Sequence, residues 1–223
     1  MMGFAKRRST HPTEIFNIKY PHDLIPKLLE LLITMLSTRF TQHSLVTEAH
    51  KTIRTYQANP QISIDATMGN GHDTDFLACH SQCVYAFDIQ KNALNSTQRR
   101  LEKTKRLDKV HLIHDGHELM HQHLPTKTKA DVIMFNLGYL PRGDEAIITK
   151  TETTLSALNL AINYLNSAGV LSIMTYPGHN GGQAEMAAIL NWLKQIKSDF
   201  AITHIHSLQE TPDSPHLFTL IKL

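Results

Sequence analysis

Apolar and polar positions divide this 223-residue chain into a short helical front and a long alternation of strands and helices. In the front part, apolar residues recur at helical spacing over residues 21–38 and 44–56. Beyond residue 60, short apolar runs alternate with amphipathic segments. This pattern predicts strands at residues 62–67, 83–89, 110–114, 131–136, 170–176, 201–208 and 217–223, and helices ending near residue 80 and spanning 91–106, 151–166 and 183–197.

The order of these elements predicts an α/β fold. Strands that alternate with helices form right-handed βαβ units, whose parallel sheet is covered by helices on both faces. No helix separates the last two predicted strands, so these two are expected to pair antiparallel. We predict a seven-stranded, mostly parallel sheet with one antiparallel strand. The domain boundaries expected are an N-terminal helical extension at 1–43 and a main domain at 44–223, with Gly169 ending the helix before the fifth strand.

The charge of the chain is nearly balanced, with 22 Lys+Arg against 20 Asp+Glu and a pI near 8.5. A nucleic-acid-binding domain is expected to have a pI above about 9. The balance hides an uneven distribution, because residues 1–44 carry a net +3 and six basic residues crowd into 99–109. A solvated helix face is one interpretation of this basic run. A surface that follows the phosphates of a nucleic acid is the alternative.

Cysteine and histidine usage argues against disulfides and metals. Cys79 and Cys83 are too few for a disulfide framework, and their spacing fits neither a redox motif nor a four-Cys zinc site. Five histidines lie within 111–123, but no Cys or carboxylate pattern completes a tetrahedral site. No signal-peptide core or membrane-length apolar run is present. A cytoplasmic protein without membrane contact or metal is expected, and a transit peptide at the N-terminus is the alternative.

Candidate chemistry is sought at the strand ends, because ligands of open α/β sheets bind outside the carboxyl ends of the strands. The first predicted strand runs into Gly69 and Gly71, which let the backbone approach a ligand closely. Thr74 stands where a dinucleotide motif has its third glycine, which weakens an NAD interpretation. Asp88 ends the second strand, where it either accepts hydrogen bonds from a ribose diol or caps the helix beginning at Lys91.

The later strand ends are also polar. Residues 115–118 form a polar cluster that could frame an adenine edge. Asn136, followed by Gly138 and Tyr139, offers an acceptor for an amine N–H beside a stacking platform for a flat ring. A merely structural turn is the alternative for this segment. Residues 176–182 form a glycine-rich loop able to close over a site.

These motifs together carry a family resemblance. DATMGNGHDT, FDIQ, DGHE, FNLGYLPRGD and YPGHNGG resemble class I S-adenosylmethionine-dependent methyltransferases, which have a Rossmann-like fold. More narrowly, they resemble the small family labelled rRNA methylases, whose members are associated with methylation of the 5-aminomethyl group on the wobble uridine of bacterial tRNA. The resemblance covers residue 44 to the end. The segment before Ser44, the variable tail at 209–215 and Arg142, where a Gly is more usual, depart from it.

The resemblance implies roles for the matching positions. Asn136 and Tyr139 would be catalytic and orient the acceptor amine. S-adenosyl-L-methionine would contact Asp65, Thr67, Gly69, Asn70, Gly71, His72, Asp73, Asp88, Gln90, Asp115, Gly116, His117 and Asn136. The substrate would contact Leu137, Gly138, Tyr139, Arg142, Asp144, Tyr176 and His179.

The activity expected from this resemblance is methyl transfer to the amine of 5-aminomethyl(-2-thio)uridine at the tRNA wobble position, giving 5-methylaminomethyl(-2-thio)uridine. The anticodon stem-loop of tRNA is then the expected partner, and proton loss to water, Asp144 or His179 stays open. An rRNA or small-molecule amine N-methyltransferase and a non-catalytic RNA-binding module are the alternatives. For the helix at 21–38, packing on the main domain, a homodimer contact and an RNA-facing lobe remain open.

Overall fold

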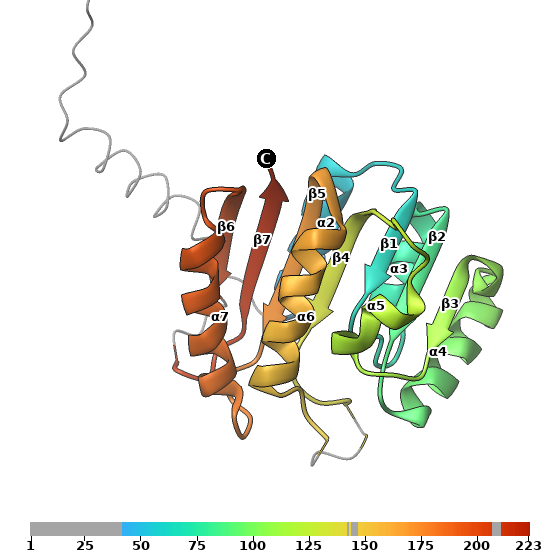
Figure 1. The fold of residues 1–223 in the computed structure, drawn as a ribbon. Coiled ribbons are helices and arrows are strands. Elements are labelled where there is room, and N and C mark those ends of the chain that lie inside the picture. The colour runs from blue at the N-terminus through green and yellow to red at the C-terminus, as the bar shows by residue number, and fades with distance from the viewer. Residues whose placement is uncertain (1–41, 142, 144–146, 207–210) are drawn as a thin grey trace, which may run out of the picture. The chain divides into compact units, whose positions relative to one another are not determined.

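The computed structural model describes residues 42–141, 143, 147–206 and 211–223, which form a seven-stranded sheet in the order β3-β2-β1-β4-β5-β7-β6 (Figure 1). Strands β1 to β5 pair in parallel, and β7 runs antiparallel to both β5 and β6. The predicted sheet with one reversed strand is therefore confirmed. The strands are β1 (Ile62–Asp65), β2 (Cys83–Phe87), β3 (Val110–Ile113), β4 (Ala130–Asn136), β5 (Leu165–Thr175), β6 (Phe200–His206) and β7 (His216–Lys222).

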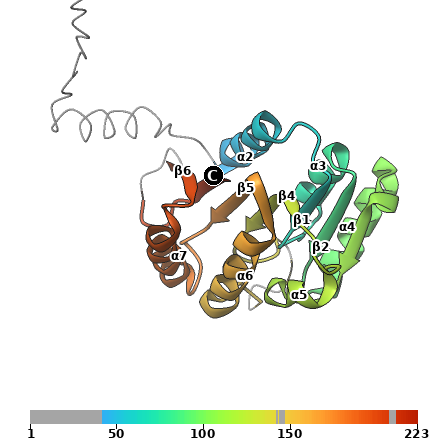
Figure 2. The same cartoon turned by 45° about the horizontal axis from the view of Figure 1, so that its top comes forward.

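Helices cover both faces of the sheet (Figure 2). One face carries α2 (Gln42–Tyr56), α3 (His72–His80) and α4 (Lys91–Thr104), and the other carries α5 (Met120–His123), α6 (Thr151–Tyr164) and α7 (Gly182–Ile196). Two short 3-10 turns, η1 (Leu107–Lys109) and η2 (His117–Leu119), precede β3 and α5. No helix among the described residues is long and apolar enough to cross a membrane.

The central strand β4 shows why the sheet is buried on both sides. Its successive side chains point to opposite faces. Ile133 and Phe135 belong to the core cluster under α6 and α7, whereas Val132 and Met134 belong to the cluster under α2, α3 and α4. All four side chains are buried. A continuous apolar run is therefore needed here, as in other parallel sheets covered on two faces.

Two features differ from the sequence prediction. The short helix α5 between β3 and β4 was not predicted, because four residues are too few to show a helical period. The start of the fifth strand, predicted at residue 170, is wrong, since α6 ends at Tyr164 and β5 begins at Leu165, so Gly169 lies within the strand and does not stop the helix. Leu165 pairs with Ala130, and the Asn166 side chain donates to Asp131 Oδ1 at 2.6 Å, so tertiary contacts extend the strand backwards.

The two closing strands form the antiparallel hairpin expected from the missing helix between them, with Phe200 opposite Lys222 and His206 opposite His216. The predicted boundary at residue 44 falls within the first turn of α2. Residues 1–41, which make up nearly all of the predicted extension, lie outside the described residues. The division into 1–43 and 44–223, and the role of the helix at 21–38, therefore stay predictions.

Candidate active site

The carboxyl ends of β1 to β5 share one edge of the sheet, the lower edge in Figure 1, and there Asp65 ends β1. Its side chain is 1% exposed, and its carboxylate accepts hydrogen bonds from Thr74 Oγ1 at 2.6 Å and Thr67 N at 3.1 Å. Burial and the nearby charge of Asp73 raise the pKa of Asp65 to about 7, against the effect of these two hydrogen bonds. Asp65 thus holds the backbone at Thr67, where the chain enters the glycine loop.

The glycine loop itself needs residues without a side chain. Gly69 and Gly71 have φ of 49° and 77°, in the left-handed region that favours glycine. A Cβ on Gly71 would lie 2.7 Å from Thr97 Oγ1 and 2.9 Å from Thr97 Cα. Thr97 Oγ1 also donates to Gly69 O at 3.1 Å. The loop is therefore pressed closely against α4.

Asp88 joins the glycine loop to the end of β2. Its Oδ2 accepts from Gly69 N at 3.0 Å and its Oδ1 accepts from Gln90 N at 2.8 Å. Burial raises the pKa of Asp88 above its usual value, although both hydrogen bonds oppose this shift. The residue thus supports the backbone just before α4, and one further lone pair on each oxygen remains for a ligand hydroxyl.

The predicted adenine cluster follows β3. Asp115 accepts from Gly116 N and from His123 Nε2, each at 2.8 Å, and the His123 hydrogen bond is the main reason that the pKa of Asp115 is lowered. His117 is 8% exposed, and its Nδ1 lies 3.1 Å from Ala66 O. Burial lowers the pKa of His117. Because a carbonyl oxygen only accepts, Nδ1 carries the proton and the ring braces the backbone after β1.

A partly buried relay of hydrogen bonds fixes the side chain of Asn136 at the end of β4. Asn136 Nδ2 donates to Asp73 Oδ2 at 3.1 Å, and the other oxygen of Asp73 accepts from His50 Nε2 at 2.7 Å. The His50 ring stacks on Phe76 with 3.7 Å between centroids and an interplanar angle of 2°. The Asn136 backbone N–H donates to Thr67 Oγ1 at 2.7 Å. Since a carboxylate only accepts, the Asn136 amide has one orientation, with Oδ1 turned away from Asp73.

The segment after β4 is tied to α7. Gly138 has φ 135°, its N–H donates to Thr149 Oγ1 at 3.0 Å, and Thr149 Oγ1 in turn donates to Glu185 Oε2 at 2.9 Å. Glu185 is 2% exposed and also accepts from Thr154 Oγ1 at 2.6 Å. Leu137 is 1% exposed and belongs to the core. Any contact of Leu137 with a substrate would therefore involve its backbone.

Two rings flank Gly138. Tyr139 is 47% exposed and meets the His179 ring edge-on at a centroid distance of 6.4 Å. A Cβ placed on Gly138 would lie 3.8 Å from His179 Nε2 and 3.7 Å from Tyr176 Cδ2. His179 Nδ1 is bonded to Asn180 O at 3.0 Å, so Nε2 holds the lone pair. This buried Nε2 has no hydrogen-bond partner among the described residues.

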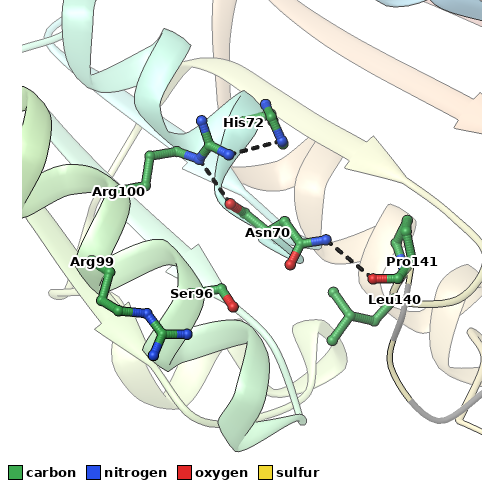
Figure 3. Close-up of a pocket in the computed structure, with 7 residues that line it drawn as sticks. All are labelled: Asn70, His72, Ser96, Arg99, Arg100, Leu140 and Pro141. Atoms are coloured by element: carbon green, nitrogen blue, oxygen red, sulfur yellow. Dashed lines mark hydrogen bonds between the residues drawn. The ribbon is translucent and has the colours of Figure 1, made fainter.

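Other predicted site residues lie elsewhere. Asn70 and His72 line a neighbouring cavity beside α4 (Figure 3), where His72 Nε2 meets Arg100 Nη2 at 2.8 Å. Arg142 and Asp144 lie outside the described residues, and their predicted roles stay predictions. In the part of the chain that is described, no group of three His, Cys, Asp or Glu side chains could hold a metal ion.

Comparison with known proteins identifies this arrangement. The family described as "Putative rRNA methylase" matches residues 84–222, more than half of the chain. The chain belongs to this rRNA methylase family. The resemblance inferred from the strand-end motifs is thereby confirmed.

Relatives of this rRNA methylase chain include a curated protein of Arabidopsis thaliana, the chloroplastic tRNA (mnm(5)s(2)U34)-methyltransferase, which is 40% identical over 138 residues. That match covers 56% of this chain and 50% of the relative, so the chain spans about half the length of the curated relative. A putative rRNA methylase from Clostridium thermocellum is 33% identical with a TM-score of 0.75. A putative methyltransferase from Streptococcus mutans, in complex with SAH, is 35% identical with a TM-score of 0.72. Each structural match covers 80% of this chain and 97% of the other.

The strand-end residues of this rRNA methylase chain fit an adenosine-containing sulfonium cofactor. The glycine loop presents bare backbone, the Asp88 carboxylate keeps lone pairs for ribose hydroxyls, and Asn136 Oδ1 is turned away from Asp73. The fold is that of the methyltransferases, so the predicted fold class is confirmed. Contact of each individual predicted residue with the cofactor stays a prediction.

Several residues that build the site of this rRNA methylase chain were missed by sequence reasoning. His50 was assigned only to a helix, and Glu185 and Thr149 carried no motif. His50 lies 23 residues before its partner Asp73, and Thr149 lies 36 residues before its partner Glu185. One signal was available. Glu185 and His50 lie beside the apolar residues of their amphipathic helices, where a polar side chain needs a partner.

Proposed function

We propose that this protein is an S-adenosylmethionine-dependent methyltransferase that methylates the amine of 5-aminomethyl(-2-thio)uridine at the wobble position of tRNA, giving 5-methylaminomethyl(-2-thio)uridine. The observation that carries the proposal is the Asn136 amide, whose Oδ1 is oriented by the Asp73–His50 relay beside the glycine loop. The name of the Arabidopsis relative supports the nucleoside, and the SAH bound by the Streptococcus mutans relative supports the cofactor. The anticodon stem-loop and a cytoplasmic location belong to the same proposal.

The chain's residues would hold the cofactor at the strand ends. Asp88 and Gln90 bind the ribose, the segment at Asp115 and Gly116 frames the adenine, and the backbone of Gly69 faces the methionine end. The bound cofactor supplies an electrophilic methyl group on a sulfonium. Because this methyl is already activated, correct alignment of the acceptor supplies most of the rate, and effective molarities of about 10⁵ M or more show how much alignment can achieve.

The Asn136 side chain orients the acceptor. A primary amine attacks through its lone pair, so its N–H bonds must point away from the methyl group. Asn136 Oδ1 accepts one of these N–H bonds, and its orientation is kept because Nδ2 remains bonded to Asp73. The exposed Tyr139 ring offers a face on which the uracil can stack.

His179 receives the proton that the amine releases. Its Nδ1 proton is held by Asn180 O, so its Nε2 lone pair beside Gly138, which no described residue engages, is the available base. General base catalysis by a histidine contributes a factor of about 10² to 10⁴. His179 is therefore our candidate among the three proton acceptors left open by the sequence, of which Asp144 lies outside the described residues.

Nucleoside analysis tests the proposed substrate. tRNA from a strain lacking the protein is digested and examined by mass spectrometry, with the strain complemented by the wild type or by Asn136→Ala. We expect 5-aminomethyl nucleosides to accumulate in the deletion strain and in the Asn136→Ala strain, and the methylated nucleoside to return only with the wild type. Unchanged wobble uridines after deletion would contradict the proposed substrate.

Two further measurements address the alternatives. A purified protein that methylates rRNA or a free amine faster than tRNA would favour the second candidate class. Calorimetry with S-adenosylmethionine addresses the non-catalytic alternative, because an RNA-binding module that has lost its catalytic role would show no cofactor binding. The intact glycine loop and the oriented Asn136 favour binding.

A further inference from the structure

A cavity of about 650 Å³ lies beside the strand-end site, between α4 and the segment after β4 (Figure 3). One wall is formed by Ser96, Arg99 and Arg100 of α4, and the opposite wall by Leu140 and Pro141. We call this cavity the α4 groove. Asn70 and His72 line it between the two walls, and Asn70 Nδ2 donates to Pro141 O at 3.3 Å. The glycine loop is therefore shared by the groove and the site.

Among the described residues that line the α4 groove, two are arginines and none carries a carboxylate. Among the described residues, no Asp or Glu side chain forms an ion pair with Arg99 or Arg100. The cations at the C-terminal end of the same basic run have protein partners. Arg106 pairs with Asp75 at 2.7 Å, and Lys109 Nζ bonds to Ala78 O and Ser81 O, so these cations stabilise the fold instead.

Arg100 holds the groove in shape and still has donors to offer. Its Nε donates to Asn70 O at 2.9 Å and its Nη2 to His72 Nε2 at 2.8 Å, which leaves three of the five guanidinium N–H groups. His72 accepts through Nε2, so its other ring nitrogen carries a proton. Arg99 is exposed, and no hydrogen bond holds its side chain among the described residues. Guanidinium groups of this kind suit phosphate oxygens, which they bind through paired N–H donors.

The position of the groove beside the proposed acceptor site favours a polymer as its ligand. Pro141 lies two residues after Tyr139, the residue offered for stacking of the acceptor base, and Asn70 belongs to the cofactor loop. A nucleotide chain whose reacting base lies at Tyr139 can therefore continue between the two walls. Its phosphates would face Arg99 and Arg100, and its sugars would lie against Leu140 and Pro141.

We propose that the α4 groove binds the phosphate backbone of the RNA substrate, next to the reacting nucleotide. The naming of RNA rests on the proposed function. The proposal divides the basic run at 99–109 into two parts. Arg99 and Arg100 bind RNA, whereas Arg106 and Lys109 hold α4 and the segment after it against α3.

Substitution of Arg99 tests the groove without disturbing the glycine loop, which Arg100 supports. Arg99→Ala and Arg99→Glu are compared with Lys194→Glu, a matched charge change at an exposed position of α7 on the other face of the sheet. Binding of an anticodon stem-loop RNA is measured between 50 and 200 mM salt, together with KM and kcat for methyl transfer and cofactor binding by calorimetry.

We expect Arg99→Ala to reduce the slope of log K against log salt by about 1, as for the loss of one phosphate contact. KM for the RNA should rise about tenfold, with kcat and cofactor binding unchanged, and Arg99→Glu should have the larger effect. Lys194→Glu should behave as the wild type. Equal slopes for the Arg99 variants and Lys194→Glu would overturn the groove proposal.

The readouts separate the two proposals. If the wild type binds the RNA with an Arg99-dependent slope but transfers no methyl group, the proposed function fails and the groove remains. If the wild type methylates the RNA and the Arg99 variants do so with unchanged KM and slope, only the groove fails. A wild type that binds no RNA at all contradicts both.

Discussion

Single side chains at the strand ends gain their chemistry from partners that hold them. Asn136 could present either its oxygen or its nitrogen to an acceptor, and Asp73 removes this choice by accepting from Nδ2. Asp73 is in turn held by His50, whose ring rests on Phe76. Asn136, which we propose to orient the acceptor, therefore depends on a histidine that lies on α2, outside the loops of the site.

The His50 relay can be tested with two complementary variants. His50→Gln keeps a donor for Asp73 but loses the ring, whereas His50→Phe keeps the stack on Phe76 but loses the donor. We expect His50→Phe to lower kcat about 3- to 10-fold, the value of one hydrogen bond, with cofactor binding unchanged. His50→Gln should keep most of kcat. Stopped-assay kinetics with calorimetry provide both numbers, and the opposite order of the two variants would refute the relay.

The proposed proton acceptor, His179, gives a second prediction for a single residue. His179→Ala removes the Nε2 lone pair beside Gly138, so kcat should fall about 10²-fold while KM changes little. Added imidazole should restore part of the rate in His179→Ala and leave the wild type unaffected. A variant that retains wild-type kcat would show that the proton leaves directly to water.

At the scale of elements, the close contact between the glycine loop and α4 determines where this loop lies. Gly71 precedes α3 and touches Thr97, which is fully buried on α4. α3 is also joined to the end of α4 and the segment after it, where Thr104 and Arg106 both donate to Asp75 at 2.7 Å. These contacts hold the first turn of α3 against α4 and so keep the glycine loop in one conformation.

Two glycines provide a matched test of this contact. Gly71 and Gly181 both precede a helix with φ near 80°, but a Cβ on Gly181 has no atom within 4 Å. Gly181→Ala should lower the free energy of unfolding by about 1–2 kcal/mol through the left-handed backbone alone. Gly71→Ala should lower it by about 1–3 kcal/mol more, because Thr97 must also move. Urea unfolding measures both, and equal losses would argue against close packing at Gly71.

For the whole molecule, the buried carboxyl of Asp65 links folding to pH. Its pKa is raised to about 7 in the folded protein, so the folded state binds more protons than the unfolded state between about pH 4 and 7. Stability contributed by this group is therefore lost as the pH rises through that window. Asp88, with its raised pKa, acts in the same direction, and His117, with its lowered pKa, acts in the opposite direction.

Asp65→Asn isolates this contribution. The wild type should lose up to about 1.4 kcal/mol of unfolding free energy per pH unit from the Asp65 proton between pH 5 and 7, and the variant should lack this part of the slope. The other titrating groups are present in both proteins, so the difference between the two urea-unfolding series reports Asp65. Parallel pH dependences would show that Asp65 ionises without penalty.

The sequence by itself determined the sheet, its reversed strand and the strand-end motifs. These depend on local apolar periodicity and on short runs such as the glycine turn and Asp88, whose meaning lies within a few neighbouring residues. Local patterns also set the limits of the prediction. The short helix α5 has no period of its own, and the start of β5 at Leu165 depends on pairing with Ala130 and on the hydrogen bond from Asn166 to Asp131.

Only the tertiary structure decided which residues act together. Asn136 meets Asp73 across 63 residues of chain, and His72 meets Arg100 across 28. The basic run at 99–109 reads as one cluster in the sequence, yet the fold turns Arg99 and Arg100 to a groove and Arg106 to Asp75. Hydrogen bonds and charge pairing act over a few ångströms in space, and sequence separation carries no information about that distance. The architecture was therefore readable in advance, whereas the orientation of Asn136 and the division of the basic run were not.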